Sequence, residues 1–264
     1  MTRSLFARGP WARLREAVAS SDTLLIGVDL DGTIAPIEDH PAKARVLPRV
    51  LDLLRLGATA RRTRVAVVSA RPLAAMRRLI PVAGLHRVGQ YGLEGRESPL
   101  DGRRDAIRAA ASRLADEADE AIEGIHGAWV ERKGLTVALH NRAVAPARRA
   151  ALDRVVRRFL PRARRLGFRP MPGSRVVDFV PAGFDKGAAL ARIRRAYRPD
   201  VTLYVGDSPS DEYAFRILGD RDFPVRVGRG PTGASFRVGG PADVARLLAA
   251  VLRWRIRAVP SPRR

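Results

Sequence analysis

The chain has 264 residues, of which 46% are apolar, so it can bury one or two substantial hydrophobic cores. It contains no cysteine, which excludes disulfide bonds, a thiolate nucleophile and a cysteine-based zinc site. The formal net charge of +22 comes mostly from arginines spread along the chain, and aromatic residues are few. We therefore expect no nucleic-acid partner. We interpret the positive charge chiefly as a general arginine bias, which would secondarily attract anionic substrates.

The start of the chain and its apolar runs bear on where the protein works. Residues 1–21 contain several arginines and no long apolar stretch, so they do not resemble a secretory signal. No run reaches the roughly 18 apolar residues that a membrane-spanning helix needs. We therefore expect a cytoplasmic protein without a membrane partner. These patterns do not define the oligomeric state, and a monomer is favoured.

The first part of the chain alternates strands with helices. After a short helix expected over residues 11–19, an apolar run from Leu24 to Val28 shows no polar alternation, which indicates a strand buried on both faces of a parallel sheet. The elements expected next are a helix over 49–56, a strand over 65–68, a helix over 73–80 and a short strand over 88–89. This order is typical of parallel βαβ units.

The middle of the chain has a different pattern, in which one helix-and-hairpin unit occurs twice. The expected elements are a helix over 103–122, a hairpin of 128–131 with 135–140, a helix over 146–160, and a hairpin of 165–170 with 175–180. We predict that residues 101–181 form an inserted, smaller α+β domain.

The α/β pattern then returns. The expected elements are a helix over 185–197, a strand over 201–205, a helix over 212–218, a strand over 225–227, a helix over 242–254 and a mobile basic tail over 255–264. Residues 1–100 and 182–264 are therefore predicted to form one discontinuous core domain.

Three of the expected strands end at small polar or acidic residues. Asp29 and Asp31 follow the first strand, Ser69 follows the second, and Asp207 follows the strand over 201–205. The carboxyl ends of parallel strands share one edge of a sheet, so these side chains should converge. Two carboxylates about 4 Å apart repel by roughly 4 kcal/mol at an effective dielectric of 20, and Mg²⁺ would remove this cost. The alternative is an ordinary turn after a core strand.

Two further residues join this constellation. Lys186 lies in the first turn of an expected helix, where the helix dipole disfavours a cation, so its position suits a bound anion. A solvated surface lysine is the alternative. Asp211 follows Ser208 and Pro209 in a pattern that also fits a helix capping box.

Together these residues, in this order and on these elements, resemble the haloacid dehalogenase superfamily of phosphatases, and within it the trehalose-6-phosphate phosphatases. The resemblance covers roughly residues 23–252, and its further matching segments are 67–72, 92–94, 131–133, 140–142, 185–187 and 206–215. It implies an α/β fold with a Rossmann-like parallel-sheet core and the inserted α+β domain as a cap. It also implies Mg²⁺-dependent hydrolysis of trehalose 6-phosphate.

The resemblance assigns roles to individual residues. Asp29 would be the nucleophile that forms an aspartyl phosphate, and Asp31 the general acid and then the base. Ser69 and Lys186 would bind the transferred phosphoryl group. The implied Mg²⁺ ligands are Asp29, the Asp31 carbonyl, Asp207 and Asp211. The implied substrate-binding residues are Thr33, Arg71, Glu94, Glu131, Lys133, His140 and Arg142.

The hairpin residues of this set have a simpler alternative, a solvated hairpin face. His40, His86 and His126 are expected to be structural. The chain departs from the family pattern at Ser208, Ser210 and Ala70, and where Gln90 and Tyr91 replace a pair that commonly ends in His. These departures bear on the substrate. The alternatives are therefore a phosphatase of a related sugar phosphate, such as sucrose, mannosylglycerate or glucosylglycerol phosphate, and a catalytically weak sugar-phosphate-binding regulator.

Overall fold

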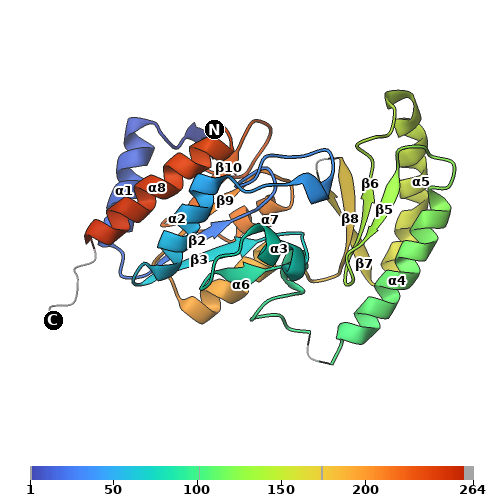
Figure 1. The fold of residues 1–264 in the computed structure, drawn as a ribbon, viewed down its shortest axis with the longest axis horizontal. Coiled ribbons are helices and arrows are strands. Elements are labelled where there is room, and N and C mark those ends of the chain that lie inside the picture. The colour runs from blue at the N-terminus through green and yellow to red at the C-terminus, as the bar shows by residue number, and fades with distance from the viewer. Residues whose placement is uncertain (1, 101, 174, 259–264) are drawn as a thin grey trace.

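A computed structural model describes residues 2–258 except 101 and 174 (Figure 1). Its larger sheet contains the strands β1 (Arg3–Ser4), β2 (Leu24–Val28), β3 (Thr63–Val68), β4 (His86–Val88), β9 (Val201–Gly206), β10 (Phe223–Val227) and β11 (Phe236–Val238). All seven strands are parallel, in the order β1-β11-β10-β9-β2-β3-β4. The predicted α/β core with a parallel sheet is confirmed.

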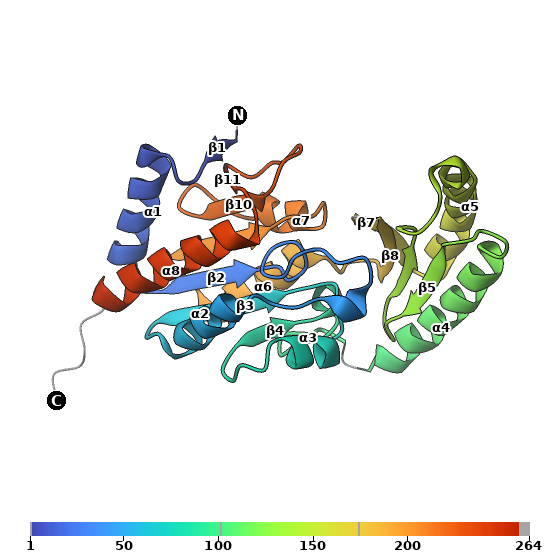
Figure 2. The ribbon, with the colours of Figure 1, turned by 45° about the horizontal axis from the view of Figure 1, so that its top comes forward.

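Helices cover both faces of this sheet (Figure 2). The helices of the core are α1 (Arg8–Ser20), α2 (Pro48–Thr59), α3 (Leu73–Leu79), α6 (Lys186–Tyr197), α7 (Asp211–Arg216) and α8 (Pro241–Ala258). Residues of α1, α2 and α8 pack in the larger core cluster, and residues of α6 and α7 pack in a cluster on the other face. The sheet is thus the middle layer of three.

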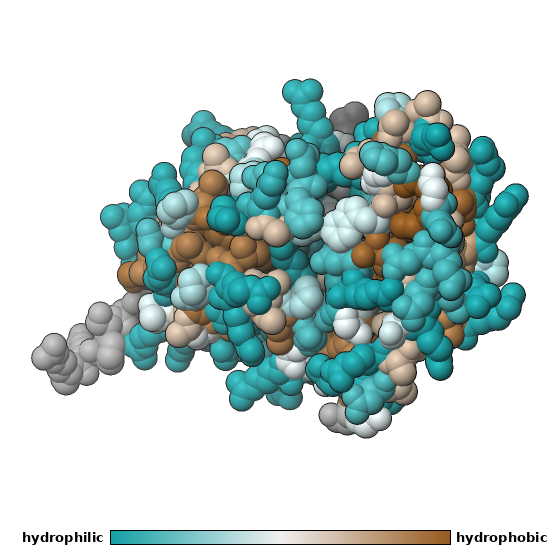
Figure 3. Space-filling model, turned by 45° about the vertical axis from the view of Figure 1, so that its right-hand side comes forward, coloured by the Kyte–Doolittle hydropathy of each residue, from teal (hydrophilic) through white to brown (hydrophobic). Residues whose placement is uncertain are grey.

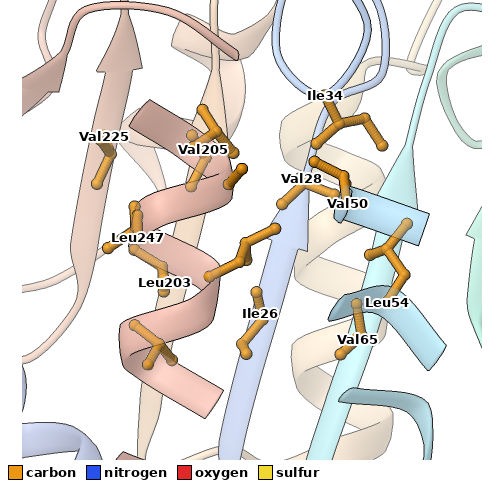
Figure 4. Packing of buried hydrophobic residues seen from close by; sticks show 14 of the residues in the cluster. Ile26, Val28, Ile34, Val50, Leu54, Val65, Leu203, Val205, Val225 and Leu247 are labelled. Carbon is orange, nitrogen blue, oxygen red and sulfur yellow. The ribbon is translucent and has the colours of Figure 1, made fainter. Parts of the chain in front are cut away.

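Alternate side chains of β2 enter different layers. Ile26 and Val28 pack against α2 and α8 in the cluster of Figure 4, whereas Leu25 packs with the α6 side. Burying an aliphatic side chain of this size stabilises the fold by about 1.5 to 3 kcal/mol. Since β2 is anchored from both faces, the residue at its carboxyl end, Asp29, is held on a rigid support.

A second sheet lies beside the carboxyl edge of the first. Its elements are α4 (Arg104–Ala121), β5 (Trp129–Arg132), β6 (Val137–His140), α5 (Pro146–Arg165), β7 (Phe168–Gly173) and β8 (Val176–Pro181), and we call them the inserted unit. The strands are antiparallel in the order β5-β6-β8-β7, and α4 and α5 pack on the face turned away from the core (Figures 1 and 2). This is the smaller α+β arrangement expected from the sequence.

The element boundaries differ from the prediction in places. The helix expected to end at residue 160 continues through Pro161 to Arg165 as α5. The second hairpin turns after Gly173, because Pro172 and Gly173 pair with Val177 and Val176. Two short strands, β1 and β11, were absent from the predicted set.

The mobile tail predicted from residue 255 is wrong for residues 255–258, which continue α8. The physical reason is Arg255, whose side chain is buried and donates hydrogen bonds to the carbonyls of Ser21 at 2.5 Å and Arg62 at 3.0 Å. Residues 259–264 of that prediction lie outside the described residues. Within the described part, no helix combines the length and the apolarity needed to traverse a bilayer. Hydrophilic side chains cover most of the face in Figure 3.

Candidate active site

One cavity of about 190 Å³ lies between the carboxyl edge of the core sheet and the inserted unit. Asp29 follows β2, Ser69 follows β3 and Asp207 follows β9, and all three line this cavity together with Asp31 and Lys186. Because β3, β2 and β9 are neighbours in the sheet, their ends meet as predicted. The structure therefore gathers residues that are far apart in the sequence.

Asp29 contacts a buried lysine. The Nζ atom of Lys186 is 2.9 Å from Asp29 Oδ1 and 2.9 Å from Asp211 Oδ1, and Lys186 is only 2% exposed. Burial acts to lower the pKa of Lys186, but Asp211 and Asp29 outweigh it, so the pKa rises and the ammonium persists. The alternative of a solvated surface lysine does not apply.

The carboxylates of this cluster outnumber the lysine. Burial raises the pKa of Asp29 well above its usual range, because the charge of Lys186, which acts to lower this pKa, does not offset burial together with the repulsion from Asp211 and Asp207. Burial, followed by the charge of Asp211, also raises the pKa of Asp207 to about 6. With all three carboxyls ionised, the cluster would carry excess negative charge, which either protons or a cation would neutralise.

The residues fit a hard divalent cation. Carboxylate oxygens of Asp29, Asp207 and Asp211 lie within 4.8 Å of one another, and oxygen ligands of this kind are those that Mg²⁺ prefers. Asp207 Oδ1 is buried and has no hydrogen-bond partner among the described residues. Gly32 has φ +81°, and a Cβ there would lie 2.0 Å from Asp207 Oδ2, so only glycine allows Asp207 this position.

Asp211 is held from several sides. Its Oδ1 accepts hydrogen bonds from Lys186 and from the Tyr204 hydroxyl at 2.9 Å. Its Oδ2 accepts from the Ser208 amide at 2.9 Å and the Ser208 hydroxyl at 2.6 Å. The contact with the Ser208 amide is one that the capping alternative predicts, but α7 begins at Asp211 and its N-cap, Ser210, makes no side-chain capping bond, so Asp211 holds the loop before the helix. Ser210 adds a hydroxyl contact to Ser208 at 2.8 Å.

Asp31 is the more accessible carboxylate. Its side chain is 39% exposed, and the guanidinium of Arg71 binds it with Nε–Oδ2 and Nη2–Oδ1 distances of 2.6 and 2.8 Å. Arg71 also donates to the Pro41 carbonyl at 2.9 Å. The Ser69 hydroxyl accepts a hydrogen bond from the backbone amide of Arg71 at 3.2 Å. The loop after β3 is therefore preorganised around Asp31.

The inserted unit supplies a second polar group across the cavity. Glu131, Lys133, His140 and Arg142 all line it, as does Asp178 of β8. Lys133 Nζ is 2.6 Å from Asp178 Oδ1, and His140 Nε2 is 2.8 Å from Glu131 Oε2. Burial acts to lower the pKa of Lys133, but Asp178 and Glu131 outweigh it, so the pKa rises. Lys133 is buried within an ionic network and is not part of a solvated face.

Two predicted substrate-binding residues do not line this cavity. Thr33 is fully buried, and its hydroxyl has no hydrogen-bond partner among the described residues. Glu94 Oε2 accepts a hydrogen bond from the backbone amide of Leu73 at 2.6 Å. Leu73 is the first residue of α3, so the Glu94 carboxylate pairs with an amide that has no partner within the helix. Their roles toward a substrate stay predictions.

Sequence reasoning missed Asp178, Tyr91 and Trp129. Asp178 could have been found as the one acidic residue in an otherwise apolar strand. Trp129 stacks between His140, at 4.0 Å, and His40, at 5.4 Å between ring centroids. His40 belongs to the core, so this stack joins the two parts of the molecule. No pattern in the sequence indicated that contact.

Comparison with known proteins decides the family. The family model described as trehalose-phosphatase matches residues 27–237, which is most of the chain. The chain belongs to the trehalose-phosphatase family. As a member of this family it is a phosphatase.

Individual relatives agree with this membership. This chain is 30% identical over 227 residues to trehalose-6-phosphate phosphatase of Escherichia coli (strain K12), and the match covers 82% of each chain. It is 30% identical over 234 residues to trehalose-phosphate phosphatase of Mycobacterium tuberculosis (strain ATCC 25618 / H37Rv), covering 82% of this chain but 58% of that longer protein.

A solved structure shares the fold of this family member. The C-terminal domain of trehalose-6-phosphate phosphatase from C. albicans superposes with a TM-score of 0.81 at 18% identity, covering 96% of this chain and 99% of that one. A phosphatase of the haloalkanoate (HAD) enzyme superfamily from Bacteroides thetaiotaomicron also shares the fold, with a TM-score of 0.53 at 14% identity, which agrees with the fold that the sequence resemblance implies.

Proposed function

We propose that this phosphatase hydrolyses trehalose 6-phosphate to trehalose and phosphate. The observation that supports this most is that one cavity is lined both by Asp29 and Asp31 of the core and by Lys133 and His140 of the inserted unit. Groups suited to phosphoryl transfer therefore face groups suited to sugar hydroxyls. The named relatives, which carry this substrate in their names, support the choice of sugar.

In the first step, the Asp29 carboxylate attacks phosphorus and the bond from phosphorus to the sugar oxygen breaks, which gives an aspartyl phosphate. Asp31 donates a proton to the departing sugar oxygen. In the second step, Asp31 takes a proton from the water that attacks the aspartyl phosphate, and phosphate leaves with Asp29 restored. The greater exposure of Asp31 suits a group that exchanges protons with substrate and water.

Lys186 and Ser69 hold the phosphoryl oxygens in this proposal. Lys186 already contacts Asp29 at 2.9 Å, so its charge lies where the nucleophile and the phosphoryl group meet. This charge reduces the repulsion between two anions and persists through the transition state.

Asp29, Asp207 and Asp211, with the Asp31 carbonyl, would hold Mg²⁺. When bound, the ion supplies positive charge that stabilises the negative charge of the transferring group. The single ammonium of Lys186 cannot balance these carboxylates and an incoming phosphate, which is why we include a dication.

Residues 101–181 act as a cap on the core formed by 1–100 and 182–264. The hairpin of β5 and β6 presents its polar residues to the sugar, and Arg71 lies where the two parts meet. Thr33 and Glu94 would contribute indirectly, since neither lines the cavity.

Phosphate release from a panel of sugar phosphates, with Mg²⁺ and with EDTA, tests this function. We expect release from trehalose 6-phosphate that requires Mg²⁺, and loss of all but a few per cent of it in Asp29→Asn, since Asn keeps the shape but is a poor nucleophile. Release only from another sugar phosphate would select the related phosphatases. Absence of release from every ester would select the regulator.

A further inference from the structure

Gln90 and Tyr91 lie in a short 3-10 helix, η2 (Gln90–Gly92), which follows β4 in the core. Both have positive φ, +45° and +61°, which costs free energy for residues other than glycine. Both are almost fully buried. Backbone strain of this kind persists only where the surrounding contacts enforce it, and it is common at functional sites.

The backbone of this pair is fixed to the catalytic loop after β3. The backbone amide of Gln90 donates a hydrogen bond to the Arg71 carbonyl at 3.0 Å, and the backbone amide of Tyr91 donates one to the Ser69 carbonyl at 3.1 Å. Ser69 and Arg71 both line the cavity. The position of the pair is therefore set by the loop that would bind the phosphoryl group.

The side chains of the same pair point the other way, to the inserted unit. Gln90 Oε1 accepts the Thr136 hydroxyl at 2.9 Å and the Leu135 amide at 3.3 Å, in the turn that follows Lys133. The Tyr91 hydroxyl donates to Asp178 Oδ2 at 2.7 Å. Two consecutive residues thus bind the hairpin that carries Lys133 and the strand that carries Asp178.

Asp178 is the link between Tyr91 and Lys133. Its Oδ1 accepts from Lys133 at 2.6 Å while its Oδ2 accepts from Tyr91, and its side chain is 4% exposed. A buried carboxylate with both oxygens bound has one orientation available. The direction of Asp178, and through it the place of the Lys133 ammonium in the cavity, therefore depends on the Tyr91 hydroxyl.

We propose that Tyr91 is a positioning residue for substrate binding, which acts through Asp178 to set Lys133 at a fixed distance from the phosphoryl-binding loop. This inference rests on the proposed function, because it assigns Lys133 to the sugar. The recognised ligand is the sugar part of a phosphate monoester, and the tyrosine itself need not touch it. Gln90 binds the same hairpin through its side-chain oxygen, which accepts hydrogen bonds from the Leu135 amide and the Thr136 hydroxyl.

Tyr91→Phe tests the proposal, since it removes one hydroxyl and keeps the ring and the backbone preference. We expect KM for trehalose 6-phosphate to rise roughly tenfold or more, with a smaller change in kcat, because hydrogen bonds to charged groups are among the stronger ones. The loss in kcat/KM should be smaller for p-nitrophenyl phosphate, which has no sugar. Tyr197→Phe, a tyrosine on α6 outside the cavity, is the matched control and should retain wild-type kinetics.

Asp178→Asn, alone and combined with Tyr91→Phe, shows whether the tyrosine acts through the carboxylate. The double variant should lose little beyond Asp178→Asn, because the two residues form one chain of contacts. Additive losses, unchanged KM in Tyr91→Phe, or equal losses on both esters would each overturn the proposal. If Tyr91→Phe does not fold, the proposal requires that Asp178→Asn alone raise KM for trehalose 6-phosphate, and an unchanged KM in that variant would overturn it.

The wild-type protein separates this inference from the proposed function. If it releases phosphate from another sugar ester instead, the same variants are measured on that ester. If it turns over no sugar phosphate, the proposed function fails. A wild type active on a sugar ester with an unaffected Tyr91→Phe leaves the function intact and rejects only the positioning role.

Discussion

At the scale of single residues, the cluster around Asp29 is defined by its charge. Lys186 is the one ammonium within contact of Asp29 and Asp211 among the described residues, and Asp207 adds a third carboxylate. Burial of so many like charges is unfavourable unless protons or cations neutralise them. The protonation state of the cluster and its affinity for a metal cation should therefore be linked.

Metal binding should depend on pH through Asp207, whose pKa burial and Asp211 raise to about 6. A carboxyl group with a raised folded-state pKa favours folding while it is protonated, and this contribution disappears as the pH rises through about 6. Mg²⁺ needs the ionised carboxylate. The increase in Tm caused by Mg²⁺ should thus grow between about pH 5 and pH 7.5. Thermal unfolding with Mg²⁺ and with EDTA across this range checks it, and a pH-independent difference would contradict it.

The effect of Asp31→Asn should depend on the leaving group. A sugar alkoxide needs a proton as it departs, whereas p-nitrophenolate is stable without one. Single-turnover phosphoryl transfer should therefore fall by roughly a hundredfold or more for trehalose 6-phosphate and by much less for p-nitrophenyl phosphate. Rapid-quench measurement of the first step on both esters gives the comparison. Equal losses would argue against Asp31 as the acid.

At the scale of elements, the sequence predicted those parts that local pattern determines. The apolar runs of β2, β3 and β9 and the polar residues at their ends were correctly located, because a strand buried on both faces needs such a run. The strands β1 and β11 have two and three residues, too few for a periodicity, and exist because the neighbouring strand supplies hydrogen-bond partners. Pro161 lies inside α5, where packing of Phe159 and Ala163 outweighs the lost hydrogen bond.

In the candidate site, too, local sequence pattern predicted some residues, whereas others depend on how distant elements pack. Asp29, Asp31, Ser69 and Asp207 could be grouped from strand ends, and Lys186 could be added from its place in the first turn of a helix. The contacts of Asp178 and Trp129 depend on how the inserted unit docks on the core, which no local pattern encodes.

Helix α6 gives a prediction at this scale, because its N-cap residue, Asp185, precedes Lys186 directly. Asp185 Oδ1 accepts the Ala188 amide at 2.7 Å, and Oδ2 accepts from Arg169 of the inserted unit at 2.8 Å. Loss of an N-cap typically costs about 0.5 to 2 kcal/mol. Asp185→Ala should lower Tm and also reduce turnover, since the first turn that holds Lys186 frays.

The control for this prediction is Asp185→Asn, since Asn caps helices about as well as Asp. Chemical denaturation and kcat of both variants give the test. If Asp185→Asn loses as much stability as Asp185→Ala, the pairing with Arg169 is the important contact and capping is secondary.

At the scale of the whole molecule, the cavity lies between the two sheets, and the proposed function gives each sheet a separate role. In that proposal, phosphoryl chemistry belongs to the parallel sheet and sugar recognition to the antiparallel one. The two functions should therefore be separable by mutation. His140→Ala should lower kcat/KM for trehalose 6-phosphate by roughly tenfold or more, and by less for p-nitrophenyl phosphate, because only the former presents hydroxyls to the inserted unit.

His126→Ala supplies the matched comparison, as His126 belongs to the inserted unit but is exposed and does not line the cavity. Steady-state kinetics of both variants on both esters complete the measurement. A parallel fall on the two esters in His140→Ala would place that histidine in the phosphoryl-transfer apparatus.

The insertion of α4 to β8 within the core also determines when the active site forms during synthesis. A ribosome delivers β2 early, but β9, which pairs with β2 from Leu24 opposite Val201 to Val28 opposite Val205, emerges only after the whole inserted unit. The antiparallel sheet pairs only segments within that unit, so it can fold before β9 is available to pair with β2 in the core. In the proposed function, a nascent chain that stops before β9 therefore has the sugar-facing hairpin and the nucleophile, but lacks Asp207 and Asp211 of the proposed metal site.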